Sequence, residues 1–182
     1  GQETPPRVLL LGLGCGELAT HVAQRCSDMQ VDAVELDPRL PVMARRYFGL
    51  PASVQVTVDD ALSFVLARQQ EIQQDQLLAD SKSYDVVFVD CFSDGGETPE
   101  HCRSQEFLRA IHAIVRDGGK VIQHLWHNDV RHTQVAQEFK ATVTLFENEF
   151  SCQGCRVEVT RVGPDSVDDL VVVSIPASSS QA

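Results

Sequence analysis

The chain has 182 residues, 43% of them hydrophobic and 23% charged, which suits one globular domain with a buried core. Its formal net charge of −11 repels nucleic-acid phosphates and favours a basic or amine-bearing partner, either a protein segment or a polyamine. Solubility alone would explain this charge equally well. No apolar run approaches the roughly 20 residues that span a bilayer, and no signal peptide is present, so we expect a cytoplasmic protein without membrane contact.

Short apolar runs alternate with longer amphipathic ones along the first half of the chain, which is typical of βαβ units around a parallel sheet. The continuous apolar run at 8–11 is expected for a strand buried on both faces of such a sheet. A polar, glutamine-rich stretch at 69–83 is a helix extension or a surface insertion. The predicted strands lie at 8–11, 31–36 and 54–58, and each precedes a helix, at 17–25, 38–47 and 61–71.

The second half continues the alternation and then ends in two consecutive strands. The predicted elements are strands at 84–90 and 120–125 around a helix at 104–115, a helix at 129–146, and strands at 157–162 and 170–174. Residues 117–119 are expected to turn into the fifth strand, and residues 142–145 could be a strand instead of helix. The last two strands flank a turn at 163–165 and are expected to form an antiparallel hairpin.

We expect residues 1–182 to form a single domain, with a disordered tail at about 178–182. The first strand begins within ten residues of the start, where enzymes of this architecture usually carry an N-terminal element that covers the substrate. The chain is therefore expected to be a fragment of a longer protein, with an unusually bare domain as the alternative. The oligomeric state stays open, a homodimer included.

Six cysteines raise the question of disulfides or zinc. Only Cys152 and Cys155 form a C-x-x-C pair, and a zinc site usually needs a second pair at suitable spacing. No histidine pair with ligand spacing lies near them. We therefore predict free thiols and no structural zinc.

A glycine-rich turn follows the first predicted strand and opens a helix. Its glycines let the backbone turn tightly and approach a ligand, while the helix N-terminus offers free N–H groups. Glu35 comes 19 residues after Gly16, at the end of the second strand, where a carboxylate can bind both ribose hydroxyls. We predict a nucleotide-cofactor site held by Gly12, Gly14, Gly16 and Glu35.

The residue at position 17 discriminates between cofactors. A dinucleotide fingerprint needs Gly or Ala there, and a carboxylate such as Glu17 would repel a pyrophosphate. A sulfonium cofactor has no phosphate, so the sequence favours S-adenosylmethionine over NAD. A glycine turn that binds no ligand is the alternative.

Two more carboxylates follow strands at the same sheet edge. Asp60 comes after the third strand, where it can accept a hydrogen bond from an adenine amino group or cap the helix that begins at Ala61. Asp90 ends the fourth strand, at the carboxyl edge where open α/β sheets bind ligands. Asp60, Ala61 and Asp90 therefore join the predicted cofactor site.

Several segments resemble the spermidine synthase-like branch of the class I S-adenosylmethionine-dependent methyltransferases, over roughly residues 8–175. They are VELDP at 34–38, RYFGL at 46–50, YDVV at 84–87, DCFSD at 90–94, PEH at 99–101 and DGG at 117–119. GLGCGEL at 12–18 is similar to the C-terminal domain of the dual methyltransferases of elongation factor 1-alpha. The resemblance implies a Rossmann-like α/β fold, with a mostly parallel seven-stranded sheet and helices on both faces.

The sequence departs from the aminopropyltransferases of this branch. Cys15 stands where their glycine loop carries an Asp for the amine of the decarboxylated cofactor. Ser93 stands where a second carboxylate acts as base, with Asp94 one residue late. Their N-terminal β-hairpin domain has no counterpart in this sequence. Two lost anionic contacts would cost roughly 3–6 kcal/mol, at about 1.5–3 kcal/mol each, so polyamine synthesis is disfavoured and stays an alternative.

We therefore predict methyl transfer to an amine nucleophile carried by a protein. Asp90 would orient a neutral amine, with Asp94 as an alternative acceptor. His124, at the end of the fifth strand, could take a proton directly or through water, or be a satisfied histidine beneath the loops. Trp126 either walls the substrate side or packs. A catalytically degenerate domain that binds the cofactor or a partner is the rival function.

Overall fold

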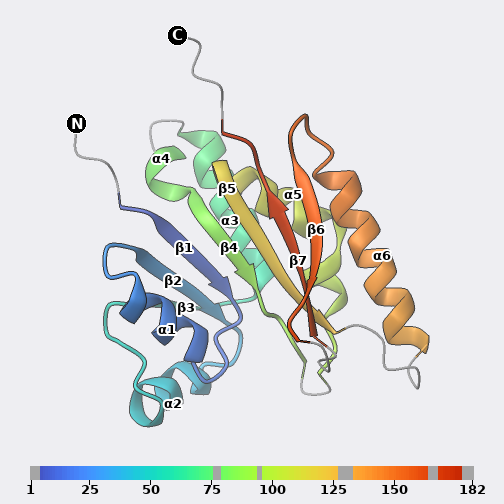
Figure 1. The fold of residues 1–182 in the computed structure, drawn as a ribbon. Coiled ribbons are helices and arrows are strands. Elements are labelled where there is room, and N and C mark those ends of the chain that lie inside the picture. Colours follow the sequence, from blue (N-terminus) through green and yellow to red (C-terminus); the bar gives the residue numbers. More distant parts are fainter. Residues whose placement is uncertain (1–4, 76–78, 94–95, 127–132, 164–167, 178–182) are drawn as a thin grey trace.

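The computed structural model describes residues 5–75, 79–93, 96–126, 133–163 and 168–177 (Figure 1). Within these ranges seven strands form one sheet: β1 Arg7–Leu11, β2 Gln30–Glu35, β3 Gln55–Val58, β4 Tyr84–Val89, β5 Val115–Trp126, β6 Arg156–Arg161 and β7 Asp168–Ser174. The helices are α1 Glu17–Arg25, α2 Arg39–Tyr47, α3 Ala61–Gln74, α4 Ala79–Lys82, α5 Gln105–Ile114 and α6 Thr133–Glu149, with a 3₁₀ helix at Glu100–Arg103. Across the described residues, no helix is long and apolar enough to cross a membrane.

The strand order is β3-β2-β1-β4-β5-β7-β6. This order indicates where along the sheet a ligand is expected to bind. Strands β1 to β5 are parallel, whereas β7 runs antiparallel to both β5 and β6. The predicted mostly parallel sheet with a C-terminal antiparallel hairpin is confirmed. The direction of the connections reverses between β1 and β4, so the crevice at the carboxyl ends of these two strands is the expected ligand site.

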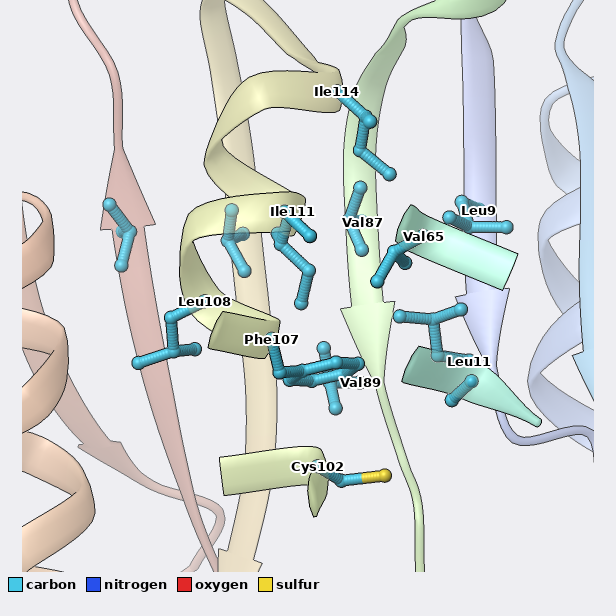
Figure 2. Close-up of a cluster of buried hydrophobic side chains, with 14 of the residues drawn as sticks. Leu9, Leu11, Val65, Val87, Val89, Cys102, Phe107, Leu108, Ile111 and Ile114 are labelled. Carbon is cyan, nitrogen blue, oxygen red and sulfur yellow. The ribbon is translucent and has the colours of Figure 1, made fainter. Parts of the chain in front are cut away.

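Side chains of the central strands alternate between two apolar layers, one on each face of the sheet. Leu9 and Leu11 of β1 belong to the larger cluster, with Phe107 and Ile111 of α5 (Figure 2). Leu10 lies between them in sequence and belongs to the second cluster, which includes residues of α1 and α2. Because β1 is covered on both faces, its continuous apolar sequence is explained.

Strand β5 begins earlier than predicted, at Val115 instead of residue 120. Residues 117–119 belong to the irregular start of this strand, where the register against β4 shifts between Tyr84 and Val86. A Cβ on Gly119 would lie 2.8 Å from the Arg116 carbonyl oxygen and 2.9 Å from that of Asp85, so the backbones come close there. The predicted turn is therefore wrong, because a glycine pair inside a bulged strand has the same local sequence as a turn.

The structure also settles the predicted elements at helix α6 and at the glutamine-rich stretch. The described helix ends at Glu149, three residues beyond the predicted end at 146. The alternative strand at 142–145 is wrong, since the Thr142 hydroxyl donates to the Glu138 carbonyl one helical turn back, at 2.8 Å. The glutamine-rich stretch extends α3 and then includes α4. The helix start at 129, most of the turn at 163–165 and the tail at 178–182 lie outside the described residues.

A partly buried polar network lies at the amino-terminal edge of the sheet. The Tyr84 side chain is fully buried, and its hydroxyl donates to the Asp32 carboxylate at 2.9 Å. The Arg7 guanidinium pairs with the same carboxylate and lies 4.6 Å from the centre of the Tyr84 ring. Burial, followed by the charge of Asp32, raises the pKa of the Tyr84 phenol, so the hydroxyl stays a donor.

Replacing Tyr84 by Phe removes this hydroxyl and keeps the ring. We expect the free energy of unfolding to fall by about 1–3 kcal/mol, the scale of a hydrogen bond to a charged group. Tyr47→Phe is the matched control, because Tyr47 is 65% exposed and should change stability by less than about 0.5 kcal/mol. Urea denaturation measures the free energy of unfolding of both variants. Equal losses of stability would show that the hydroxyl of Tyr84 does not stabilise the fold.

Candidate functional site

The turn after β1 lies directly against the end of β4. The Asp90 amide donates to the Leu11 carbonyl at 2.8 Å, and the Gly12 amide donates to the Val34 carbonyl of β2 at 2.9 Å. Gly12 has φ +98°, and a Cβ at this position would lie 2.3 Å from the Asp90 carbonyl oxygen. Only glycine allows this approach. The predicted cofactor turn and Asp90 are therefore held together, backbone to backbone.

The other two predicted glycines continue the same turn. Gly14 has φ +54°, and nothing lies within 4 Å of the place where its Cβ would be. Gly16 is the residue that precedes α1, and a Cβ there would lie 3.1 Å from the Leu50 side chain. The three glycines thus lead from the end of β1 into the first turn of α1.

Glu35 holds the glycine turn from the end of β2. It is 8% exposed, and one of its carboxylate oxygens accepts from the amides of Leu13 and Gly14 at 3.0 and 3.2 Å. The other oxygen accepts from the Asp37 amide at 2.9 Å. A buried carboxylate needs such donors, because burying a charge without them is costly. Glu35 therefore lies at the predicted turn, and its contact with ribose hydroxyls stays a prediction.

Asp60 and Ala61 start α3 next to the segment that leads from β4 to α5. The Asp60 carboxylate accepts from the Ser63 amide at 2.9 Å and thereby caps the helix. Its second oxygen lies 3.0 Å from Nε2 of His101, a partner that the sequence did not predict. Ala61 is 8% exposed and packs in the larger core cluster. The capping role is confirmed, while the adenine contact of Asp60 and Ala61 stays a prediction.

A cavity of about 480 Å³ opens beside the glycine turn. Its polar and charged side chains come from the turn, from the first half of α1 and from the end of β4. Glu35, Asp60 and Ala61 are not part of its lining, so it covers only one part of the predicted site. The residues that line it include Gly12, Gly14, Cys15, Glu17, His21 and Asp90.

His124 lies between two carboxylates at the carboxyl edge of the sheet. Its Nδ1 is 2.8 Å from Oδ1 of Asp90, and its Nε2 is 2.9 Å from Oδ1 of Asp168. The hydrogen bond with Asp90 has the largest effect and raises the pKa of His124; partial burial opposes it, and Asp168 adds to the rise. The predicted residues Asp90 and His124 are thus together, Asp94 lies outside the described residues, and Asp168 was not predicted.

The raised pKa of His124 links folding stability to pH. Since the folded state favours the imidazolium, this contribution to stability is fully present below about pH 6.5, the ordinary pKa of histidine. It is lost as the pH rises through the pKa of His124 in the folded protein.

Phe92 contacts His124, and Trp126 contacts Phe92 in turn. The rings of Phe92 and His124 lie at 75° to each other with centroids 4.9 Å apart, and the centroid of Phe92 lies 5.7 Å from that of Trp126. A Cβ on Gly96 would lie 2.2 Å from the Trp126 ring, so the backbone at Gly96 also packs on it. Trp126 is nevertheless 42% exposed. It therefore packs against the segment after β4 and also presents surface beside His124.

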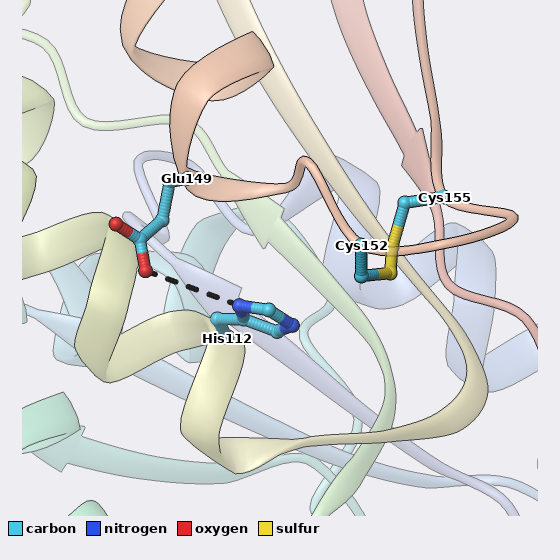
Figure 3. Close-up of a disulfide and its surroundings, with 4 residues drawn as sticks. All are labelled: His112, Glu149, Cys152 and Cys155. Carbon is cyan, nitrogen blue, oxygen red and sulfur yellow. Dashed lines mark ion pairs between the residues drawn. A yellow bond between two sulfur atoms is a disulfide. The ribbon is translucent and has the colours of Figure 1, made fainter.

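The prediction of free thiols is wrong for Cys152 and Cys155. They form a disulfide three residues after Glu149, which pairs with His112 (Figure 3). The turn between α6 and β6 brings their Cα atoms to 5.2 Å, inside the range that a disulfide spans. This turn lies at the amino-terminal edge of the parallel strands, opposite His124. The other cysteines, Cys15, Cys26, Cys91 and Cys102, are free.

Metal-ligating side chains are not grouped in the described part of the chain. No set of three or more His, Cys, Asp or Glu residues there could hold a metal ion. The absence of a structural zinc at Cys152 and Cys155 stays a prediction.

No protein-family model matches the chain, but curated proteins do. It is 24% identical over 144 residues to a polyamine aminopropyltransferase of Vibrio vulnificus and 28% identical over 158 residues to an N-terminal histidine N-methyltransferase of Emericella nidulans. It is 31% identical over 136 residues to the eEF1A lysine and N-terminal methyltransferase of Mus musculus. These matches cover 79%, 86% and 71% of this chain but only 46%, 26% and 18% of the relatives, so the chain spans less than half of their length.

Solved structures match almost the whole chain. Human methyltransferase-like protein 13, in complex with S-adenosylhomocysteine (SAH), has a TM-score of 0.74 at 22% identity, over 98% of this chain and 75% of that one. Spermidine synthase from Thermotoga maritima has 0.66 at 14% identity, over 95% and 54%. Fibrillarin from Aeropyrum pernix, with bound S-adenosylmethionine, has 0.65 at 17% identity, over 93% and 66%.

The chain therefore has the Rossmann-like fold of the class I methyltransferases, with helices on both faces of the sheet. Among proteins of this fold, its relatives include methyltransferases that act on protein lysines and N-termini, and polyamine aminopropyltransferases. The resemblance to the spermidine synthase-like branch is confirmed.

Gly12→Ala tests the contact between the glycine turn and β4. The new Cβ would overlap the Asp90 carbonyl, so the free energy of unfolding should fall by roughly 1–3 kcal/mol beyond the cost of the positive φ. Gly14→Ala is the matched control, since it has positive φ but open space, and should cost only about 1–2 kcal/mol. Urea denaturation compares the two variants. Equal losses would contradict the close approach of Gly12 and Asp90.

Proposed function

We propose that the chain binds S-adenosylmethionine and transfers its methyl group to an amine of a protein. The observation that carries this proposal is the junction of Gly12 and Asp90, which joins the cofactor turn to a carboxylate beside His124. A cofactor on the turn and an acceptor on Asp90 would share one cavity. Two structural neighbours were solved with SAH or S-adenosylmethionine, which supports this choice of cofactor.

The residues of the site fit a sulfonium cofactor better than a dinucleotide. Glu17 lines the cavity, so a pyrophosphate there would face a carboxylate, whereas S-adenosylmethionine carries no phosphate. Glu35 would accept from the ribose hydroxyls with the lone pairs that its three amide donors leave. Leu36 follows it and is 69% exposed, which offers an apolar surface to the base. Asp60 and Ala61 would border the adenine.

The chemistry then depends on how the protein treats the amine. When bound, the cofactor supplies a methyl group on a sulfonium that needs no further activation. The protein has to hold a neutral amine in line and accept the proton that it loses. Asp90 would accept an N–H from the amine, and its contact with His124 gives the proton a base to reach. Asp94 stays an alternative acceptor.

Aminopropyl transfer is the second candidate, and the aminopropyltransferase relatives favour it. The cavity, however, presents Cys15 where the resemblance implies an Asp in those enzymes. The Ser93 hydroxyl accepts from the Glu97 amide at 3.3 Å within its own loop, and a hydroxyl in this position does not replace a carboxylate base. Methyl transfer therefore explains more of the site.

A protein amine is the acceptor class that fits the whole molecule. The relatives named for their substrates methylate lysine and the N-terminus of eEF1A, or an N-terminal histidine. The net charge of −11 favours the approach of a basic protein segment by electrostatic steering. A free amine on such a segment is the nucleophile that we propose.

Isothermal titration should show that SAH binds more tightly than NAD. Glu35→Gln keeps the volume and removes the charge, so affinity for SAH should fall by about 10–150-fold, or about 1.5–3 kcal/mol. Asp28→Asn is the control, because Asp28 is exposed in the turn before β2, and it should keep the affinity of the parent. Tighter binding of NAD would overturn the cofactor assignment. Unchanged affinity in Glu35→Gln would overturn the ribose contact.

Asp90→Asn keeps the shape and hydrogen-bonding capacity of the side chain and removes its charge, so SAH affinity should stay intact. Methyl transfer should slow by about 10–1,000-fold, since the variant loses about 1.4–4 kcal/mol of transition-state positioning. The assay measures labelled methyl transfer to eEF1A and to basic peptides with free or acetylated N-termini. Asp28→Asn should retain full activity. Formation of spermidine from putrescine and the decarboxylated cofactor would refute the methyltransferase proposal. If the parent chain showed neither methyl transfer nor spermidine formation but still bound SAH, the result would favour a binding module.

A further inference from the structure

Side chains from three neighbouring strands meet at the carboxyl edge of the sheet. The register of β4 against β5 places Asp90 next to His124. On the other side of β5, Leu170 of β7 pairs with His124, and Asp168 comes two residues before Leu170. Residues two apart on a strand share a face, so Asp168 is the diagonal neighbour of His124. The strand ladder, and not a loop, therefore sets the position of Asp168.

With both carboxylates ionised, both contacts of the imidazole are hydrogen bonds only if each ring nitrogen carries a proton. Nδ1 lies 2.8 Å from Asp90 and Nε2 lies 2.9 Å from Asp168. A neutral imidazole has one N–H, so it would place a lone pair against a carboxylate oxygen at one of these contacts. An imidazolium donates at both. The geometry therefore fits the proton-loaded ring, a cation between two ionised carboxylates.

The surroundings of His124 support this assignment. In the described part of the chain, the charged groups that face the ring are Asp90 after β4 and Asp168 of β7. Phe92 contacts the ring in a T-shaped arrangement and is apolar. The two carboxylates raise the pKa of His124 in spite of partial burial, as expected for a cation held between them.

We propose that Asp168 is a positioning residue for methyl transfer that acts through His124. By accepting from Nε2, Asp168 turns Nδ1 toward Asp90 and the acceptor amine, and it stabilises the charge that the ring gains. This inference rests on the proposed function. As the amine nitrogen bonds to the methyl carbon, the carbon–sulfur bond breaks and its electron pair stays on sulfur. One N–H proton then leaves the amine through Asp90 to Nδ1 of His124. Loss of this proton to water returns the ring to its neutral form.

Asp168→Asn tests the proposal, because it keeps the shape of the side chain and removes its charge. In an NMR titration of the histidines, the pKa of His124 should fall, because the ring of the variant binds its proton more weakly by roughly tenfold or more. The acid limb of the kcat profile should move to lower pH with it, and kcat on the plateau should fall by about 10–100-fold. KM for the acceptor and SAH affinity should stay unchanged. A merely structural role would lower the unfolding temperature without moving the titration.

Two further variants show whether Asp168 acts through His124. Glu158→Gln removes an exposed carboxylate from the adjacent strand β6 and should change neither the titration nor kcat. In a His124→Gln background, Asp168→Asn should cause no further loss of kcat, since the residue it acts through is gone. An unchanged His124 titration, or additive losses of kcat, would overturn the proposal.

The failure of the proposed function would be distinguishable from the failure of this inference. If the parent chain transferred no methyl group, the proposed function would be wrong. The His124 titration in Asp168→Asn would then still uphold or overturn the coupling between the two residues, because it requires no turnover.

Discussion

The backbone of Gly12 and the carbonyl of Asp90 approach each other more closely than any side chain allows, and both halves of the candidate site depend on this contact. The Asp90 amide also donates to the Leu11 carbonyl, so the ladder between β1 and β4 continues one residue past the end of β4. The backbone of Asp90 is therefore hydrogen-bonded like that of a strand residue, although Asp90 stands at the start of a loop. Transfer between two bound groups requires such support, because small errors in distance and angle slow the reaction strongly. The same glycine starts the turn that we assign to the cofactor.

The glycine turn needs a second support, and the Glu35 carboxylate supplies it. Three backbone amides donate to this almost buried side chain, two of them from the turn. Without this contact the amides of the turn would lack a hydrogen-bond partner, and the charge of the Glu35 carboxylate would lack donors. The turn is thus preorganised before any ligand binds, which lowers the conformational cost of binding. In the proposed complex Glu35 would have two roles, since the carboxylate that holds the turn would also accept from the ribose.

The sequence predicted the parts of the site that depend on local pattern. The glycine turn and Glu35 are separated by one βαβ unit, and Asp90 and His124 each come at the end of a parallel strand, so the topology brings them to one edge. Asp168 escaped prediction because it begins a strand. Only the antiparallel direction of β7 places that beginning at the carboxyl edge, and the predicted strand started two residues later. The Asp-Asp pair before an apolar run in a closing hairpin was the signal available. The disulfide could not be predicted either, since C-x-x-C spacing is equally compatible with thiols, a metal or a bond.

The charges at the carboxyl edge work in two opposing directions. Carboxylates attract a cationic amine to the edge, but they also stabilise its protonated form, which cannot attack a methyl group. His124 resolves the conflict in the proposed mechanism, because the same carboxylates make it a stronger base and so provide a place for the proton. A base that holds its proton too firmly would stop after one turnover. The side chains of Asp90, His124 and Asp168 are 44%, 29% and 32% exposed, so water reaches the three groups and can remove the proton. Because the cluster is partly exposed, the strong pairing of His124 with its two carboxylates is compatible with repeated turnover.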